Sequence, residues 1–138
     1  MPHVGQEIRR ENGFMVRIVK LEPDLLEMEA HYRGDSTLPQ RHLHPKQDEH
    51  FEVLEGKVKA VIDDVEGGYG EGDQFDVPAG TVHQMAGDGP ARVLWQVRPA
   101  LRSAEFFERL YDALDNGFPE GQSFETFLAE FSDEFRLA

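Results

Sequence analysis

Short hydrophobic segments separated by turn residues run from Phe14 to Arg98. Val, Ile, Leu and Phe recur in these segments, and Gly, Pro, Asp or Asn interrupts them about every 8 to 12 residues, which is typical of an all-β sandwich or barrel. The pattern predicts eight strands, at residues 14–20, 25–33, 40–44, 49–56, 57–63, 73–78, 82–87 and 92–98. Turns are expected at Asn12-Gly13, Gly34-Asp35, Gly67-Gly68 and Gly87-Asp88-Gly89, and acidic residues 63, 64 and 66 are read as a solvated hairpin end.

The hydrophobic period becomes helical after Arg98-Pro99. Ser103 is a candidate N-cap for a helix that ends at Gly117, and Ser123 is a candidate N-cap for a second helix over 124–135. Seven of the ten Phe residues lie in this tail, most of them on the apolar helix faces. Such faces must cover the barrel or a neighbouring subunit, and core packing is favoured over a ligand cradle. We therefore predict one domain over 1–138, with a barrel at about 14–98 and a helical tail at about 102–136.

Composition and charge narrow the class of protein. The chain has no Cys, so disulfides and thiolate metal sites are excluded. Its net charge of −13 and its lack of a basic run longer than Arg9-Arg10 argue against nucleic acid and anionic membranes as partners. No apolar stretch reaches the roughly 20 residues needed to cross a bilayer, and no signal peptide is recognised, so a cytoplasmic protein is expected.

Candidate chemistry is concentrated in the segment HLHPKQDEHFEVLEG, residues 42–56. In a strand, residues two positions apart share a face, so His42 and His44 are expected to project together. Because Pro45 cannot continue the hydrogen-bond ladder, residues 45–48 are interpreted as a turn. This turn brings Glu49 back to the histidine pair, with Phe51 and Val53 on the same face, and directs residues 50 and 52 away.

A further candidate ligand, His83, opens the strand that follows the corner at Pro78 and Gly80. Three imidazoles and a carboxylate suit divalent Fe, Mn, Ni, Co, Cu or Zn better than Ca or Mg. Each imidazole needs an acceptor for its second ring nitrogen, and the sequence does not identify these acceptors.

These residues resemble the two motifs of the cupin superfamily, in particular its small single-domain members of the conserved-barrel type. His42-Leu43-His44, Glu49 and Gly56 follow the spacing of the first motif, and Gly72, Pro78, Gly80 and His83 follow that of the second. Two positions depart from the pattern: Gly34 stands seven residues before the first histidine instead of five, and Gly87 replaces a terminal Asn.

The resemblance implies a double-stranded β-helix, which is a jelly-roll barrel, followed here by two C-terminal α-helices. It also implies one divalent transition metal held by His42, His44, Glu49 and His83, a small-molecule ligand or substrate, and a homodimer.

The sequence indicates the type of reaction less narrowly than it indicates the metal ligands. The complete ligand set favours a metal-dependent enzyme, with a dioxygenase-like oxidoreductase ahead of an isomerase, and a non-catalytic ligand-binding cupin is the rival hypothesis. His31, Tyr32 and Gln96 are candidates for an acid or base, but the sequence leaves open which of them face the barrel interior. His50 is expected on the exterior.

Overall fold

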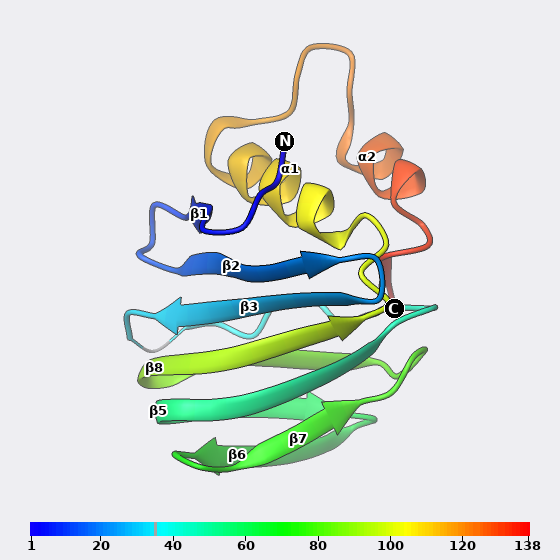
Figure 1. Cartoon of the computed structure of the whole chain (residues 1–138). Coiled ribbons are helices and arrows are strands. Elements are labelled where there is room, and N and C mark those ends of the chain that lie inside the picture. The colour runs from blue at the N-terminus through cyan, green and yellow to red at the C-terminus, as the bar shows by residue number, and fades with distance from the viewer. Residues whose placement is uncertain (35) are drawn as a thin grey trace.

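The computed structural model describes residues 1–34 and 36–138 and consists mainly of antiparallel strands with two C-terminal helices (Figure 1). The predicted turn at Gly34-Asp35 lies partly outside these residues. The strands are β1 (Glu7–Arg9), β2 (Met15–Glu22), β3 (Leu25–Tyr32), β4 (His42–Leu43), β5 (Asp48–Ile62), β6 (Val65–Gly70), β7 (Gln74–Val77), β8 (His83–Arg98) and β9 (Arg136–Leu137). The helices are α1 (Ser103–Asn116) and α2 (Phe124–Glu130).

The strands form one continuous sheet that folds into two layers, because β5 and β8 run through both. One layer has the order β1-β2-β3-β8-β5-β7 and uses the second half of β8 with the first half of β5. The other has the order β9-β4-β8-β5-β6 and uses the opposite halves of the two long strands. This arrangement confirms the predicted all-β jelly-roll class with C-terminal helices.

The predicted strand boundaries at Gly56 and at Gly87–Gly89 are wrong, because β5 and β8 continue through them. Gly56 pairs with Ala91, but Val58 pairs with Gly87, so β8 carries extra residues at this point. Such a bulge bends a strand without ending it, and bends of this kind let strands pass from one layer to the other. Gly56 has a φ of 76°, and a β-carbon there would lie 2.0 Å from the carbonyl oxygen of Pro90.

The hairpin between β5 and β6 also differs in part from the prediction. Asp63 and Asp64 form its two-residue turn with φ values of 50° and 65°, which confirms the expected hairpin end. Gly67-Gly68 was expected to be a turn, but both residues lie within β6 and pair with β5. Strands β1 and β9, of three and two residues, are too short to show an alternating pattern and were not predicted.

The helices begin and end close to the predicted positions, with two differences. Ser123 caps α2 by accepting a hydrogen bond from the Thr126 amide, and α1 ends at Gly117, as expected. Ser103, however, is the first residue of α1 and not its N-cap, because its buried hydroxyl is hydrogen-bonded to the side chain of Gln47. Helix α2 ends at Glu130 instead of 135, and the chain then turns into β9.

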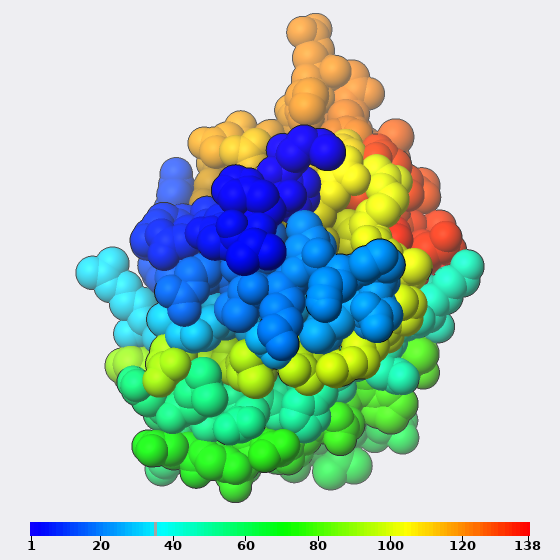
Figure 2. Space-filling view, in the orientation of Figure 1, coloured from blue at the N-terminus to red at the C-terminus, as the bar shows by residue number. Residues whose placement is uncertain are grey.

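Both helices pack at the end of the sheet next to β1 and β2 (Figure 1). Phe106, Phe127 and Phe131 are at most 1% exposed and join the hydrophobic core, which confirms the packing role predicted for the helix faces. In the space-filling view, the helical region and the N-terminal segment together cover the end of the molecule opposite β6 and β7 (Figure 2). Among the described residues, the helices are too short or too polar to cross a membrane.

Candidate metal centre and its cavity

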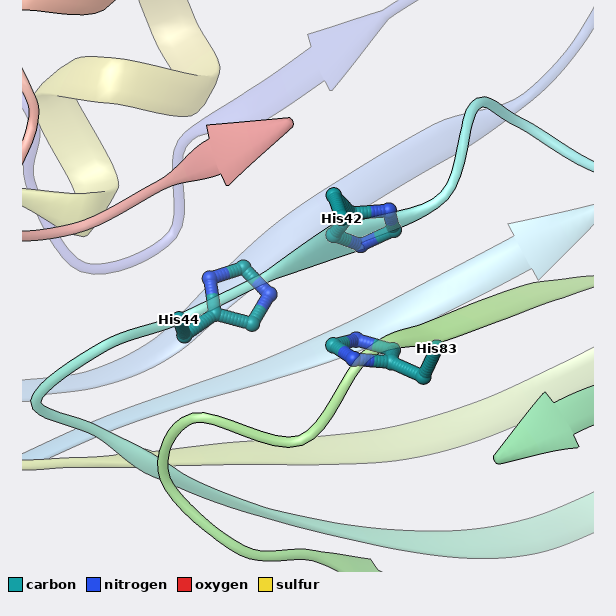
Figure 3. A group of neighbouring side chains, drawn as sticks. All are labelled: His42, His44 and His83. Carbon is teal, nitrogen blue, oxygen red and sulfur yellow. The ribbon is translucent and has the colours of Figure 1, made fainter. Parts of the chain in front are cut away.

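Three histidine rings converge from two neighbouring segments (Figure 3). His42 lies in β4, His44 follows that strand, and His83 opens β8 directly opposite His42 in the pairing register. The ring centroids are 4.4 to 5.3 Å apart, and one ring nitrogen from each histidine lies within 4.8 Å of the other two. The group is therefore positioned to bind a metal ion.

Backbone carbonyls determine which ring nitrogen faces the centre. The Nδ1 atoms of His42, His44 and His83 lie 2.8, 2.8 and 2.9 Å from the carbonyl oxygens of Gln40, Glu134 and Thr81, respectively. A carbonyl can only accept a hydrogen bond, so each neutral ring must donate from Nδ1. Each Nε2 then carries a lone pair and no proton, as a metal ligand requires.

Glu49, the first inward-facing residue of β5, adds a carboxylate to the same centre. Its Oε1 lies 3.2 Å from Nε2 of His44 and 3.0 Å from Nε2 of His83, while its Oε2 accepts a 2.7 Å hydrogen bond from the indole N–H of Trp95. Oε1 is buried and has no hydrogen-bond partner among the described residues. A buried oxygen that faces lone pairs is stable only with a proton or a cation between them.

The pKa values of these groups reflect the same arrangement. Burial alone would raise the pKa of Glu49, but the attraction of His44 and the contacts with His44 and His83 outweigh burial and lower it. Burial would lower the pKa of His44, but the charge of Glu49 raises it above its usual value. Burial and the neighbouring His83 lower the pKa of His42 to about 4, and the opposing effects of the Gln40 carbonyl and Glu49 are smaller. The charge of Glu49 therefore favours the protonated form of His44 when no metal is bound.

A cavity of about 720 Å³ opens directly onto the centre. Most of its wall is apolar or aromatic and comes from both the strands and the helical tail, through Phe14, Phe51, Met85, Val93, Trp95, Phe107, Leu110, Leu114, Phe124, Phe135 and Leu137. The interpretation of the tail as core packing is therefore incomplete, because several of its aromatic residues line this cavity. Its size is in the range of pockets that bind small molecules.

Among the described residues that line the cavity, the titratable groups besides the four candidate ligands are two tyrosines and two arginines. Burial raises the pKa of the phenols of Tyr32 and Tyr111, and the charge of Glu49 adds to both shifts, so both remain neutral donors at neutral pH. Arg10 is paired with Asp115 at 3.0 Å, and Arg33 lies at the exposed rim.

The strand register shows which of the candidate acid or base side chains face the cavity, a question that the sequence left open. Tyr32 faces the cavity, whereas His31 lies 3.0 Å from Glu29 on the opposite face of β3. Gln96 is hydrogen-bonded to Glu27 on that outer face and does not line the cavity. His50 pairs with Asp76 at 2.7 Å outside the barrel, as predicted.

A sequence profile described as the Cupin domain matches residues 28–97, which is about half of the chain and includes all four candidate ligands. The chain belongs to the cupin family. A search of curated proteins finds no match to this cupin.

Several solved structures share the fold of this cupin. KdgF from Halomonas sp. is 22% identical, with a TM-score of 0.63 over 71% of this chain and 89% of the other. An RmlC-like cupin from Shewanella frigidimarina is 16% identical, with a TM-score of 0.61 over 72% and 87% of the two chains. Pac13 from Streptomyces, described as a nucleoside dehydratase, is 14% identical, with a TM-score of 0.57 over 68% and 75%. At these identities the likeness concerns the fold alone.

Proposed function

We propose that this cupin is a metal-dependent enzyme for small, largely apolar substrates, and that its reaction is that of a dioxygenase-like oxidoreductase. The observation that carries the proposal is the unpartnered, buried Oε1 of Glu49, which faces histidine nitrogens at the floor of an aromatic cavity. This donor set suits a cation, and the cavity offers space for a ligand directly beside it.

The proposed ligands are His42, His44, Glu49 and His83, holding one divalent transition metal such as Fe, Mn, Ni, Co, Cu or Zn. Three imidazoles and one carboxylate fit these ions better than Ca²⁺ or Mg²⁺. Trp95 supports the assignment because its N–H holds Oε2 of Glu49 and leaves Oε1 directed to the histidines. When bound, the metal would act as a Lewis acid on substrate oxygens and, if it is redox-active, support reaction with O₂.

The cavity wall favours oxygenation over isomerisation. Isomerisation by proton transfer needs a base that can accept a substrate proton. Beyond the proposed ligands, the titratable lining residues that the structure describes are two neutral phenols and two arginines, which are poor bases at neutral pH. A substrate with acidic enol or phenol oxygens can bind as its anion without such a base. In a dioxygenase reaction both atoms of O₂ enter the product, so no external reductant is consumed.

The chain's own residues would contribute orientation and exclusion of water. The aromatic wall would bury the apolar body of the substrate, and the phenols of Tyr32 and Tyr111 would donate hydrogen bonds to its remaining oxygens. An isomerase with a tyrosine as general acid, or a cupin that binds its ligand without changing it, is the alternative that the same cavity permits.

The test is O₂ uptake by the Fe(II)-loaded protein with a panel of flavonols, 1,3-diketones and catechols. We expect uptake with at least one class, product that carries both atoms of labelled O₂, and loss of uptake in Glu49→Ala. His50→Ala is the matched control, since His50 lies outside the barrel. A compound that binds the loaded protein but is recovered unchanged, with no uptake by any panel member, would support the binding module instead.

The homodimer and the cytoplasmic location remain predictions from the sequence. Light scattering of the purified chain tests the first, and a monomer at high concentration would contradict it.

A further inference from the structure

We propose that the C-terminal segment Glu134–Leu137 is a positioning element of the metal centre, which holds two of the proposed ligands through groups that are not ligands themselves. The inference rests on the proposed function, because it assumes that the histidines bind a metal. It concerns one backbone carbonyl, one aromatic ring and the pairing of β9 with β4.

Strand β4 carries His42 but is poorly anchored without the tail. It consists of two residues, and its pairing with β8 involves only His42 and His83. Strand β9 pairs with both residues of β4, through Leu137 and Arg136, and the amide of Ala138 donates a 2.9 Å hydrogen bond to the carbonyl of Arg41. The tail therefore supplies most of the backbone pairing of the strand from which the ligand projects.

His44 depends on the tail more directly. His42 and His83 donate to the carbonyls of Gln40 and Thr81, each two residues earlier in the same segment. His44 instead donates to the carbonyl of Glu134, which lies 90 residues away. Its ring orientation is thus set by a part of the chain that is remote in sequence.

The carbonyl of Glu134 is itself held in place. The residue is 5% exposed, its amide donates a 2.9 Å hydrogen bond to the carbonyl of Phe131, and its carboxylate accepts a hydrogen bond from the amide of Arg102 at 3.3 Å. A fixed acceptor keeps Nδ1 protonated and Nε2 directed at the centre. This hydrogen bond also raises the basicity of the imidazole as a metal ligand.

Phe135 holds the other imidazole. Its ring stacks on His42 with centroids 5.1 Å apart and planes 18° from parallel, and it stacks on Phe106 at 4.9 Å and 28°. Phe106 is 1% exposed within α1, so the stack connects the ligand to the helical core. This stack restricts rotation of the His42 ring, and Figure 3 shows β9 beside the histidines.

The experiment measures Co²⁺ affinity, by competition with a chelator and by visible absorption, in Phe135→Leu and in a chain that ends at residue 133. Phe135→Leu keeps an apolar side chain but removes the ring stack, and the shortened chain removes the carbonyl of Glu134 together with Phe135 and β9. We expect each to lower Co²⁺ affinity about 10- to 100-fold, the range seen when groups that orient metal ligands are lost. Phe135→Tyr should restore the affinity.

Phe118→Leu is the matched control, because Phe118 packs in tilted pairs with Phe124 and Phe127 and is not among the described residues that line the cavity. It should reduce the thermal stability of the metal-free protein and leave Co²⁺ affinity unchanged. Equal affinity in wild type, Phe135→Leu and the shortened chain would overturn the proposal, as would an equal loss in Phe118→Leu.

A second readout separates this inference from the proposed function. In the metal-free protein at alkaline pH, ¹⁵N NMR should show His44 protonated on Nδ1 in the full chain and exchanging between tautomers in the shortened chain. A wild type that binds no Co²⁺ would contradict the proposed function, whereas unchanged His44 tautomers in the shortened chain would contradict the positioning role.

Discussion

Acid should destabilise the metal-free protein because folding buries His42 in its neutral form. Burial and the neighbouring His83 lower the pKa of His42 from its ordinary value of 6.5 to about 4. Between these pH values the unfolded chain binds more protons than the folded chain. The free energy of unfolding therefore rises with pH in this window. The contribution of His42 is fully present above pH 6.5 and is lost as the pH falls towards 4.

The size of the effect follows from the shift. A difference of one pKa unit corresponds to about 1.4 kcal/mol, so the full change from neutral pH to below pH 4 is about 3 kcal/mol. At pH 5 the linkage relation gives a loss of about 2 kcal/mol. His44 acts in the opposite direction, because its raised pKa stabilises the folded state at low pH and this contribution disappears as the pH rises above its folded value.

The assay is urea unfolding of metal-free wild type and His42→Gln from pH 7.5 to 4.5. The glutamine has no ionisable ring, so subtracting the two curves isolates His42 and removes most of the His44 contribution. We expect wild type to lose about 2 kcal/mol more than the variant between pH 7 and 5. Parallel curves, or an NMR titration that places the pKa of His42 at 6.5 or higher, would refute the reasoning.

Three other predictions concern neighbouring groups. Metal binding near neutral pH should release a proton from His44, because Glu49 raises the pKa of this histidine. The calorimetric enthalpy of metal binding should therefore depend on the ionisation enthalpy of the buffer, and buffer independence would contradict this assignment. Trp95→Phe removes the donor to Oε2 of Glu49 and should weaken Co²⁺ binding about tenfold in a chelator competition, with an unchanged affinity counting against the role of the indole. Gln47→Leu leaves the carbonyls of Pro99 and Ala100 and the hydroxyl of Ser103 without their buried donor. It should reduce the free energy of unfolding, measured by urea unfolding, by about 2 to 4 kcal/mol. A loss below about 0.5 kcal/mol would show that water replaces the amide.

The barrel and the centre were largely predictable because their signals are local. Alternation along β5 placed Glu49, Phe51 and Val53 inside and His50 outside, and the burial pattern confirms this. The same period-two rule placed His42 and His44 together. The register of β3 against β8, which sends Tyr32 inward and Gln96 outward, depends on pairing between distant segments, so it could not be obtained from either strand alone.

The predicted strand boundaries were wrong where a glycine is compatible with either a turn or a bend within a strand. Gly56 and Gly89 have positive φ values, as a turn would require, yet both lie in bends of continuous strands. A local pattern does not distinguish a chain that reverses from one that bends and keeps its partners, because the distinction lies in the hydrogen bonds of a distant strand.

The groups that orient the metal ligands also fall into two classes: some are close in sequence and predictable, and the others are remote and were not predictable. The carbonyls of Gln40 and Thr81 lie two residues before their histidines, so a search for local acceptors would have found them. Trp95 is 46 residues from Glu49, and Glu134 is 90 residues from His44, so no short motif connects them. Phe135 appeared to be one more apolar residue on a helical stripe, and the early end of α2 is what places it on His42.

The 90-residue separation between His44 and the carbonyl of Glu134 has a consequence for biosynthesis. Residues 134–137 are synthesised after strands β1 to β8, so a nascent chain can pair these strands before the groups that orient His44 and His42 have emerged. Metal that binds such a chain early would meet imidazoles that are free to rotate and would leave readily. Tight retention of the ion should therefore begin only once residues 134–137 have left the ribosome, which would delay metallation relative to pairing of the earlier strands.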